Sequence, residues 1–259
     1  MLPKSYRVGR VPVSPASMQE VCSVVENTVR DGGKGYICVS NMRTVTIANK
    51  DDRYFRVMEN SILNTPDGRP LVWCGRAWGL KEVDSVLGPD IFERLLTAGS
   101  PLLKHFFLGD TQQTLDALSL KCREEFGLEP AGMYSPPFAP LESYDIQDIA
   151  DRINNSGATL VWTSLRAPKQ DFLAEALMPL LNDGIVMIGV GAAFRFMLGE
   201  YKMSRGLIQR MGFGGFQVVR NSSFWNETKW YFKHTGWQIR YIAQILWRRF
   251  VLRKQCDEL

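Results

Sequence analysis

Short apolar runs alternate with longer segments of mixed polarity along the first 190 residues of this sequence. The clearest runs contain no Lys, Arg, Asp or Glu, and they cover Tyr36–Ser40, His105–Leu108, Ala158–Thr163 and Ile185–Val190. A helix is predicted after each of the first three runs. Near-continuous apolar strands that alternate with helices are typical of a parallel sheet buried on both faces. The pattern therefore predicts an α/β fold with a mostly parallel sheet and helices on both of its faces.

Turn-forming residues set the boundaries of the remaining predicted elements. We expect one or two short strands in 7–13, broken at Gly9 and Pro12, and another strand in 127–134. His105 begins an apolar run, and we expect it in the core or at a sheet edge. Asp90 is well placed to cap the helix that follows it. Helices are predicted over 15–30, 42–50, 52–60, 70–78, 91–98, 112–126, 145–154 and 170–181.

One turn combines a carboxylate with a predicted strand end. The apolar segment 61–63 is followed by Asn64-Thr65-Pro66-Asp67-Gly68, and Pro70 then suits the first turn of a helix. Ligands of open α/β sheets bind at the carboxyl ends of the strands. Asp67 is therefore a candidate for chemistry, although an Asp-Gly pair in a loop can also serve the turn alone.

Charge divides the chain into two parts. Residues 1–199 contain 20 basic and 23 acidic residues, whereas residues 200–259 contain 11 basic and 4 acidic residues. The second part also contains four of the seven tryptophans. We therefore predict a domain over 1–199 and a basic, aromatic, helical appendage over 200–259. This appendage could bind an anionic membrane surface, bind nucleic acid, or pack on the domain, and its helical periodicity does not decide among the three.

Other motifs restrict the class of function. The five cysteines lack a CxxC pair, which favours free thiols in a reducing compartment, and no apolar run is long enough for a membrane-spanning helix. Together with the polar N-terminus, this predicts a cytoplasmic protein. The segment 189–194, GVGAAF, lacks the third glycine of a dinucleotide fingerprint. Walker A, HExxH, GxSxG and Asp-x-Asp motifs do not occur, so we expect no cofactor and no metal site.

Several loops, taken in order, resemble the WecG/TagA/CpsF family of bacterial glycosyltransferases over roughly residues 5 to 250. The resemblance rests on a strand ending in Asn41, the Asp67-Gly68 turn, and the segments 88–90 (GPD), 106–109 (FFLG), 167–171 (APKQD) and 188–194 (IGVGAAF), with the basic aromatic tail after them.

The resemblance implies a Rossmann-like domain with an appendage that meets the membrane. It implies inverting, metal-independent transfer of a sugar, usually from a UDP-sugar, to a polyprenyl-diphosphate-linked saccharide on the cytoplasmic face of the inner membrane. Asp67 matches the family's proposed general base, and Asn41 and Gln170 match its polar site residues. Substrate binding is expected at Asn41, Gln170, Lys169, Gly109, Gly191, Arg195, Lys202, Arg205 and Arg210.

The sequence departs from the family at Val39, Ser85 and Arg195, where the family has threonine, arginine and aspartate. These differences indicate either an outlying branch or a different set of phosphate-binding arginines. Arg195, Lys202, Arg205 and Arg210 could bind the diphosphate of the donor or that of the acceptor. Asn41 could instead cap the helix that it begins.

We therefore predict a hexosyltransferase of cell-surface or exopolysaccharide synthesis that is peripherally associated with the cytoplasmic face of the membrane and does not bind nucleic acid. Two alternatives stay open at this point: a nucleic-acid-binding or scaffold protein that uses the basic tail, and an NAD-dependent oxidoreductase. The oligomeric state is also open, a homo-oligomer included.

Overall fold

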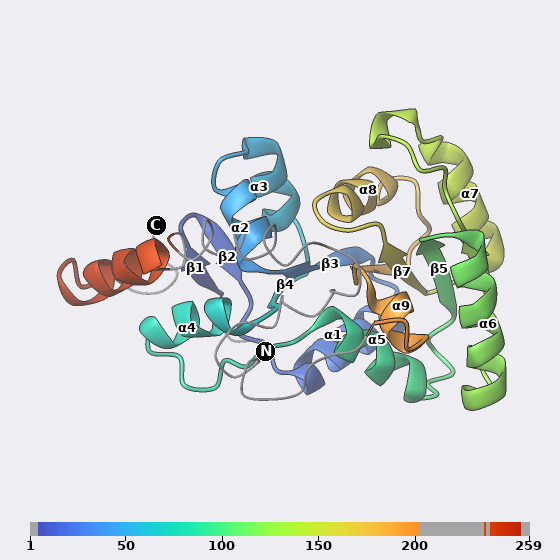
Figure 1. The fold of residues 1–259 in the computed structure, drawn as a ribbon, viewed down its shortest axis with the longest axis horizontal. Helices are drawn as coiled ribbons and strands as arrows, with labels where there is room; N and C mark the ends of the chain where they lie inside the picture. Colours follow the sequence, from blue (N-terminus) through green and yellow to red (C-terminus); the bar gives the residue numbers. More distant parts are fainter. Residues whose placement is uncertain (1–4, 202–235, 237–238, 255–259) are drawn as a thin grey trace.

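A parallel six-stranded sheet forms the centre of the molecule (Figure 1). The computed structural model describes residues 5–201, 236 and 239–254. The strand order is β4-β3-β8-β7-β5-β6, and every neighbouring pair is parallel. The strands are β3 (Gly35–Ser40), β4 (Leu63–Pro66), β5 (His105–Gly109), β6 (Gly132–Tyr134), β7 (Leu160–Ser164) and β8 (Val186–Gly189). The predicted α/β fold is confirmed.

Helices cover both faces of this sheet (Figure 1). One face carries α2 (Met42–Ala48), α3 (Asp52–Glu59), α7 (Ile146–Ser156) and α8 (Lys169–Leu177). The opposite face carries α1 (Met18–Arg30), α5 (Gly88–Thr97), α6 (Gln112–Phe126) and α9 (Ala193–Met197). A hairpin of β1 (Tyr6–Val8) and β2 (Val11–Val13) packs against α4 (Arg69–Ala77), and a 3-10 turn, η1, covers Leu141–Ser143.

Two hydrophobic cores result from the alternation of side chains along the strands. In β3, Tyr36 and Cys38 belong to the core beneath α2, α3 and α8, whereas Ile37 and Val39 belong to the core beneath α1 and α5. Both sets are buried, which explains why the sequence is apolar at consecutive positions rather than at alternate ones.

His105 lies in the core, as the sequence predicts. Its imidazole is buried, and Nδ1 accepts a hydrogen bond of 2.9 Å from the indole Nε1 of Trp162 on the neighbouring strand β7. Burial lowers the pKa of His105 to about 4, so the ring is neutral at physiological pH. The residue therefore has a structural role.

The strand before Asp67 differs from its prediction. The sequence favours a strand over 61–63 that ends at Asn64, but β4 covers Leu63–Pro66. Asn64 and Thr65 pair with Cys38 and Val39 of β3, and both are buried despite their polarity. The Asn64 amide donates to the carbonyl oxygen of Met58, which satisfies it inside the protein. Pro66 is tolerated because β4 is an edge strand and Pro66 is its last residue.

The helix starts also differ in detail. Helix α1 begins at Met18 with Ser17 and Glu20 forming a reciprocal capping box, three residues later than the predicted start. Helix α5 begins at Gly88, so Asp90 lies in its first turn and does not cap it as expected. Its carboxylate is consequently near the positive end of the helix dipole.

The C-terminal helix (residues 239–250) packs on the domain beside α4 and the hairpin (Figure 1). Tyr241 and Ile245 are buried in the same core as Tyr6 and Leu71, and Arg249 donates to the carbonyl oxygen of Ala77 at 2.8 Å. In the described part of the chain, no helix has the length and apolarity that crossing a membrane requires. The division of the chain at residues 199 and 200 stays a prediction.

Candidate active site at the carboxyl edge of the sheet

The carboxyl ends of all six strands meet at one edge of the sheet because the strands are parallel. Asp67, Asn41 and Gly191 follow the adjacent strands β4, β3 and β8. The helix after β3 packs on one face and the helix after β8 packs on the other. Such a reversal opens a crevice outside the strand ends, where ligands of α/β proteins bind.

Main-chain hydrogen bonds hold Asp67 at this edge. Its N–H donates to the carbonyl oxygen of Ser40 at 2.7 Å, which joins the loop after β4 to the loop after β3. The next N–H, that of Gly68, donates to the hydroxyl oxygen of Ser85 at 2.9 Å. Gly68 has a φ of +96° and directly precedes α4. The carboxylate is thus presented on a short turn that is fixed on both sides.

The pKa of Asp67 is raised to about 7, first by burial and then by repulsion from the carboxylate of Asp90. Its side chain is half-buried and accepts no hydrogen bond from any residue that the structure describes. A carboxylate with a pKa near the working pH can take a proton efficiently and release it again. The geometry therefore suits Asp67 to general base chemistry.

Asn41 caps helix α2. Its side-chain oxygen accepts from the backbone N–H groups of Arg43 and Thr44, at 3.0 and 3.1 Å. The capping alternative from the sequence thus accounts for the oxygen of Asn41. The amide nitrogen donates to no residue within 5–201 or 239–254, so it is the part of Asn41 that a substrate could still engage.

Gln170 connects two loops of the edge. It is 2% exposed, and its side-chain oxygen accepts from the backbone N–H of Gly191 at 3.1 Å. The neighbouring Asp171 is 3% exposed and accepts a hydrogen bond of 2.6 Å from the hydroxyl of Tyr54. Burial raises the pKa of Asp171 to about 7. These two residues anchor the start of α8 and fix the loop after β8.

The glycine positions allow close approach of backbone segments. Gly109 has a φ of +110°, and a Cβ at this position would lie 2.8 Å from the carbonyl oxygen of Ser164 on the neighbouring strand. Ser164 in turn donates its hydroxyl to the carbonyl oxygen of Gly191 at 2.5 Å. A side chain at position 109 would therefore force apart the ends of β5 and β7.

Arg195 is paired with a carboxylate that the sequence analysis did not select. Its guanidinium donates two hydrogen bonds to Asp110, at 2.7 and 2.9 Å, and it also approaches Glu200 at 3.5 Å. Burial raises the pKa of Asp110, but hydrogen bonds from Arg195, Thr111 and Thr114 outweigh burial and keep this pKa below its ordinary value. The positive charge of Arg195 at this edge is therefore already balanced by the carboxylate of Asp110.

The Lys169 ammonium is held by residues that follow β6 rather than by the loops after β3, β4 and β8. It donates to the carbonyl oxygen of Ala139 at 2.5 Å and to the hydroxyl of Tyr144 at 2.7 Å, and it lies over the Tyr144 ring. Lys202, Arg205 and Arg210, the other predicted cations, lie outside the described residues.

Sequence reasoning missed the roles of three edge residues. Asp90 influences the pKa of Asp67, Asp110 holds Arg195, and Arg43 donates to the carbonyl oxygen of Ala167 at 3.0 Å. Asp110 directly follows the apolar strand β5, and a carboxylate at the end of a predicted strand is a signal that could have found it. Within the described parts of the chain, no three His, Cys, Asp or Glu residues are grouped as a metal site would require.

A carboxyl group ready to take a proton, at the ligand-binding edge of an α/β sheet, is consistent with an enzyme that activates a hydroxyl. Comparison with known proteins defines the class as the glycosyltransferases. Residues 6–216 match the model of the glycosyl transferase WecG/TagA/CpsF family. The chain therefore belongs to this family, as the resemblance indicated.

A curated relative from Bacillus spizizenii is similar over 70% of this chain and 69% of its own length, with 27% identity over 183 residues. It is named N-acetylglucosaminyldiphosphoundecaprenol N-acetyl-beta-D-mannosaminyltransferase. This name describes an acceptor that is linked through a diphosphate to undecaprenol.

Proposed function

We propose that this glycosyltransferase moves a hexose or N-acetylhexosamine from a UDP-sugar to a saccharide linked to polyprenyl diphosphate, with inversion and with Asp67 as general base. Family membership supports glycosyl transfer over the nucleic-acid-binding and NAD-dependent alternatives. The name of the Bacillus relative supports a lipid-linked acceptor. The product would serve cell-surface or exopolysaccharide synthesis.

The observation that carries this proposal is the position of Asp67. A sugar hydroxyl is a weak nucleophile, so a carboxylate within about 3 Å must accept its proton as the glycosidic bond forms. Asp67 stands at the end of β4, half-buried, with a pKa of about 7. In the reaction, the acceptor oxygen forms a bond to the anomeric carbon, the bond from that carbon to UDP breaks, and Asp67 takes the hydroxyl proton.

The leaving UDP diphosphate needs positive charge or hydrogen-bond donors. The α5 N-terminus supplies a positive helix dipole next to the loop after β8, since a Cβ on Gly88 would lie 2.9 Å from the carbonyl oxygen of Val190. We assign the remaining compensation to Lys202, Arg205 and Arg210, with Arg195 positioned through Asp110. The amide of Asn41 and the N–H groups near Gly191 are suited to sugar hydroxyls and phosphate oxygens.

The proposal places this enzyme on the cytoplasmic surface of the inner membrane, where its acceptor would be found. The C-terminal helix supports this location. Residues 239–254, which comprise the helix and the residues after it, contain five basic residues and several exposed apolar side chains. Helices of this composition lie in the interface between headgroups and water.

The test is a transfer assay with a panel of UDP-sugars and a short-chain polyprenyl-diphosphate-linked N-acetylhexosamine. One donor should yield a disaccharide product and UDP, and NMR should show the anomeric configuration opposite to that of the donor. Added chelator should leave the rate unchanged if catalysis is metal-independent. Asp67→Asn should form the same product about 100-fold more slowly or worse. Retained configuration, or an unaffected Asp67→Asn variant, would contradict the proposed mechanism.

A further inference from the structure

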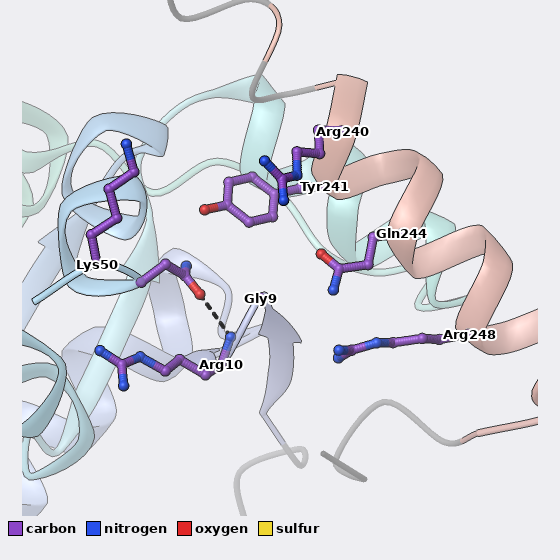
Figure 2. Close-up of a pocket in the computed structure, with 8 residues that line it drawn as sticks. Gly9, Arg10, Lys50, Arg240, Tyr241, Gln244 and Arg248 are labelled. Atoms are coloured by element: carbon purple, nitrogen blue, oxygen red, sulfur yellow. Dashed lines mark hydrogen bonds between the residues drawn. The ribbon is translucent and has the colours of Figure 1, made fainter. Parts of the chain in front are cut away.

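A cavity of about 360 Å³ lies between the C-terminal helix and the domain (Figure 2), and none of its lining residues belongs to the candidate site at the carboxyl edge of the sheet. Three segments line it: the β1–β2 turn, the end of α2, and the helix itself. Among its described lining residues are four cations and no carboxylate: Gly9, Arg10, Asn49, Lys50, Arg240, Tyr241, Gln244 and Arg248. A volume of this size is ordinary for a small-ligand site, where about 300–1,000 Å³ is typical.

The domain side of the cavity is rigidly built. The Asn49 side-chain oxygen accepts from the backbone N–H of Arg10 at 2.9 Å, and its amide donates to the carbonyl oxygens of Val8 and Val45. Gly9 has a φ of +65°, and a Cβ there would lie 2.0 Å from that same oxygen of Asn49. Only glycine lets the turn approach α2 this closely.

Arg10 is also fixed. Its guanidinium donates to the carbonyl oxygen of Ala48 and pairs with Asp52 at 2.5 Å, while Asp52 points to solvent with its side chain 80% exposed. The charge of Arg10 is thus largely balanced. The other cations of the lining are Lys50 and, from the helix, Arg240 and Arg248.

The C-terminal helix presents three different stripes. Arg240, Gln244 and Arg248 recur every four residues, and Figure 2 shows all three side chains extending from the helix toward the domain. Tyr241 and Ile245 form the buried stripe. The outward stripe is apolar, with Ile239, Leu246 and Phe250 exposed by 65%, 40% and 66%. This arrangement explains why the segment lacks a simple two-sided pattern in the sequence.

Arg248 is the cation that best indicates what the cavity binds. It is half-buried and faces the cavity, yet its guanidinium forms no ion pair with any residue in the described ranges. Lys50 and Arg240 line the same space and make further interactions of their own. A guanidinium with its planar fork of donors matches the oxygens of a phosphate group.

We propose that this cavity binds the phosphate of an anionic phospholipid headgroup, with Arg248 and Gln244 as its principal contacts. The apolar stripe lies next to the cavity on the same helix, and Trp247 is 60% exposed there. A ligand that combines a phosphate with acyl chains can satisfy both surfaces at once, whereas a soluble phosphate satisfies only one. The inference rests on the proposed action at a membrane surface, and it is independent of the sugar transferred.

The test uses the full-length protein and vesicles made of phosphatidylglycerol and phosphatidylcholine in equal parts, compared with vesicles of phosphatidylcholine alone. Arg248→Gln and Gln244→Glu change the cavity, and Arg253→Gln is the matched control. Each variant lowers the net charge by one, but Arg253 is exposed and outside the cavity lining. Sedimentation measures the fraction bound, and isothermal titration with sn-glycerol 3-phosphate measures binding of the soluble headgroup.

Arg253→Gln should weaken binding to the anionic vesicles by about fivefold, the general effect of one surface cation. Arg248→Gln and Gln244→Glu should weaken it by about twentyfold or more, since a phosphate contact is lost as well. Equal losses in all three variants would contradict a phosphate site in the cavity. Binding would then depend only on the overall positive charge of the protein surface. Saturation by glycerol phosphate with no preference for anionic vesicles would overturn the lipid assignment.

The transfer assay with the short-chain acceptor separates this inference from the proposed function. Arg248→Gln should keep the wild-type rate on that acceptor. If the wild type transfers no sugar but shows the predicted vesicle preference, the lipid site stands and the proposed function fails. If Arg248→Gln instead loses transfer to the soluble acceptor while vesicle binding is unchanged, the cavity is a substrate site and the lipid assignment fails.

Discussion

Asp67 and Asp171 share a raised pKa of about 7 but have different surroundings. Burial is the largest cause in both. Asp171 is almost fully enclosed and accepts a hydrogen bond from the Tyr54 hydroxyl. Asp67 is half-buried beside a second carboxylate and has no hydrogen-bond donor at its side chain among the described residues. A raised pKa therefore does not by itself identify a base, and we propose Asp67 rather than Asp171 because the half-buried carboxylate is the one that a substrate hydroxyl could reach.

The largest expected effect separates the two carboxylates by activity. Asp67→Asn should lower kcat/KM by about 100-fold or more, because the acceptor hydroxyl loses its base. Asp171→Asn should keep most of the activity, since asparagine has the same shape and the enclosed Asp171 side chain is out of reach of a substrate hydroxyl. Steady-state kinetics of both purified variants would check this. A larger loss from Asp171→Asn would reverse the roles that we assign.

The next effect concerns stability. Tyr54→Phe leaves a lone pair of the buried Asp171 without its donor, and the free energy of unfolding should fall by about 1–3 kcal/mol. Tyr36→Phe is a matched control, because the buried Tyr36 hydroxyl donates to the carbonyl oxygen of Val57 at 2.6 Å and not to a carboxylate. Denaturant unfolding would show losses of stability in both variants, but only Tyr54→Phe should change how stability depends on pH.

A third effect is the pH dependence of stability. The pKa of Asp171 is raised in the folded protein, so the folded state binds its proton more tightly than the unfolded state does. Stability due to this group should be present below the unfolded pKa of about 4 and be lost as the pH rises toward about 7. Asp171→Asn should flatten the stability profile between these limits. An unchanged profile would show that Asp171 is ionised in the folded protein.

The smallest expected effect tests the neighbour of Asp67. Because the base acts when deprotonated, kcat/KM should rise with pH through about 7. Asp90→Asn removes a repulsive charge and should shift this limb to lower pH by less than about one unit, since burial is the larger cause. The same substitution should leave the stability profile assigned to Asp171 unchanged. A shift to higher pH would mean that Asp90 does not repel Asp67.

Continuous apolar patterning was sufficient to predict β3, β5, β7 and β8, because strands of a doubly covered sheet bury both faces. It failed at β4, where the buried Asn64 amide is satisfied by a hydrogen bond to the Met58 carbonyl oxygen and Thr65 is buried by pairing with β3, although its hydroxyl has no partner among the described residues. Turn chemistry predicted the position of Asp67 correctly, at a strand end before a helix that contains Pro70 in its first turn.

The candidate site was harder to predict from the sequence than the fold. Single residues such as Asn41 and Gln170 could be selected from motifs, but their hydrogen-bond partners lie in other loops. The pairing of Asp110 with Arg195 joins residues 85 positions apart, so only the sheet order brings them together. The cavity beneath the C-terminal helix depends likewise on contact between the two ends of the chain.

The hydrogen bond from the Asp67 N–H to the Ser40 carbonyl has a wider consequence. It continues the ladder between β3 and β4 by one residue, so the position of the proposed base is set by main-chain atoms. Helices and outer loops could change their side chains to suit another sugar without displacing the proton acceptor. In this architecture, the residues that select the sugar can differ from the residues that position the proposed base.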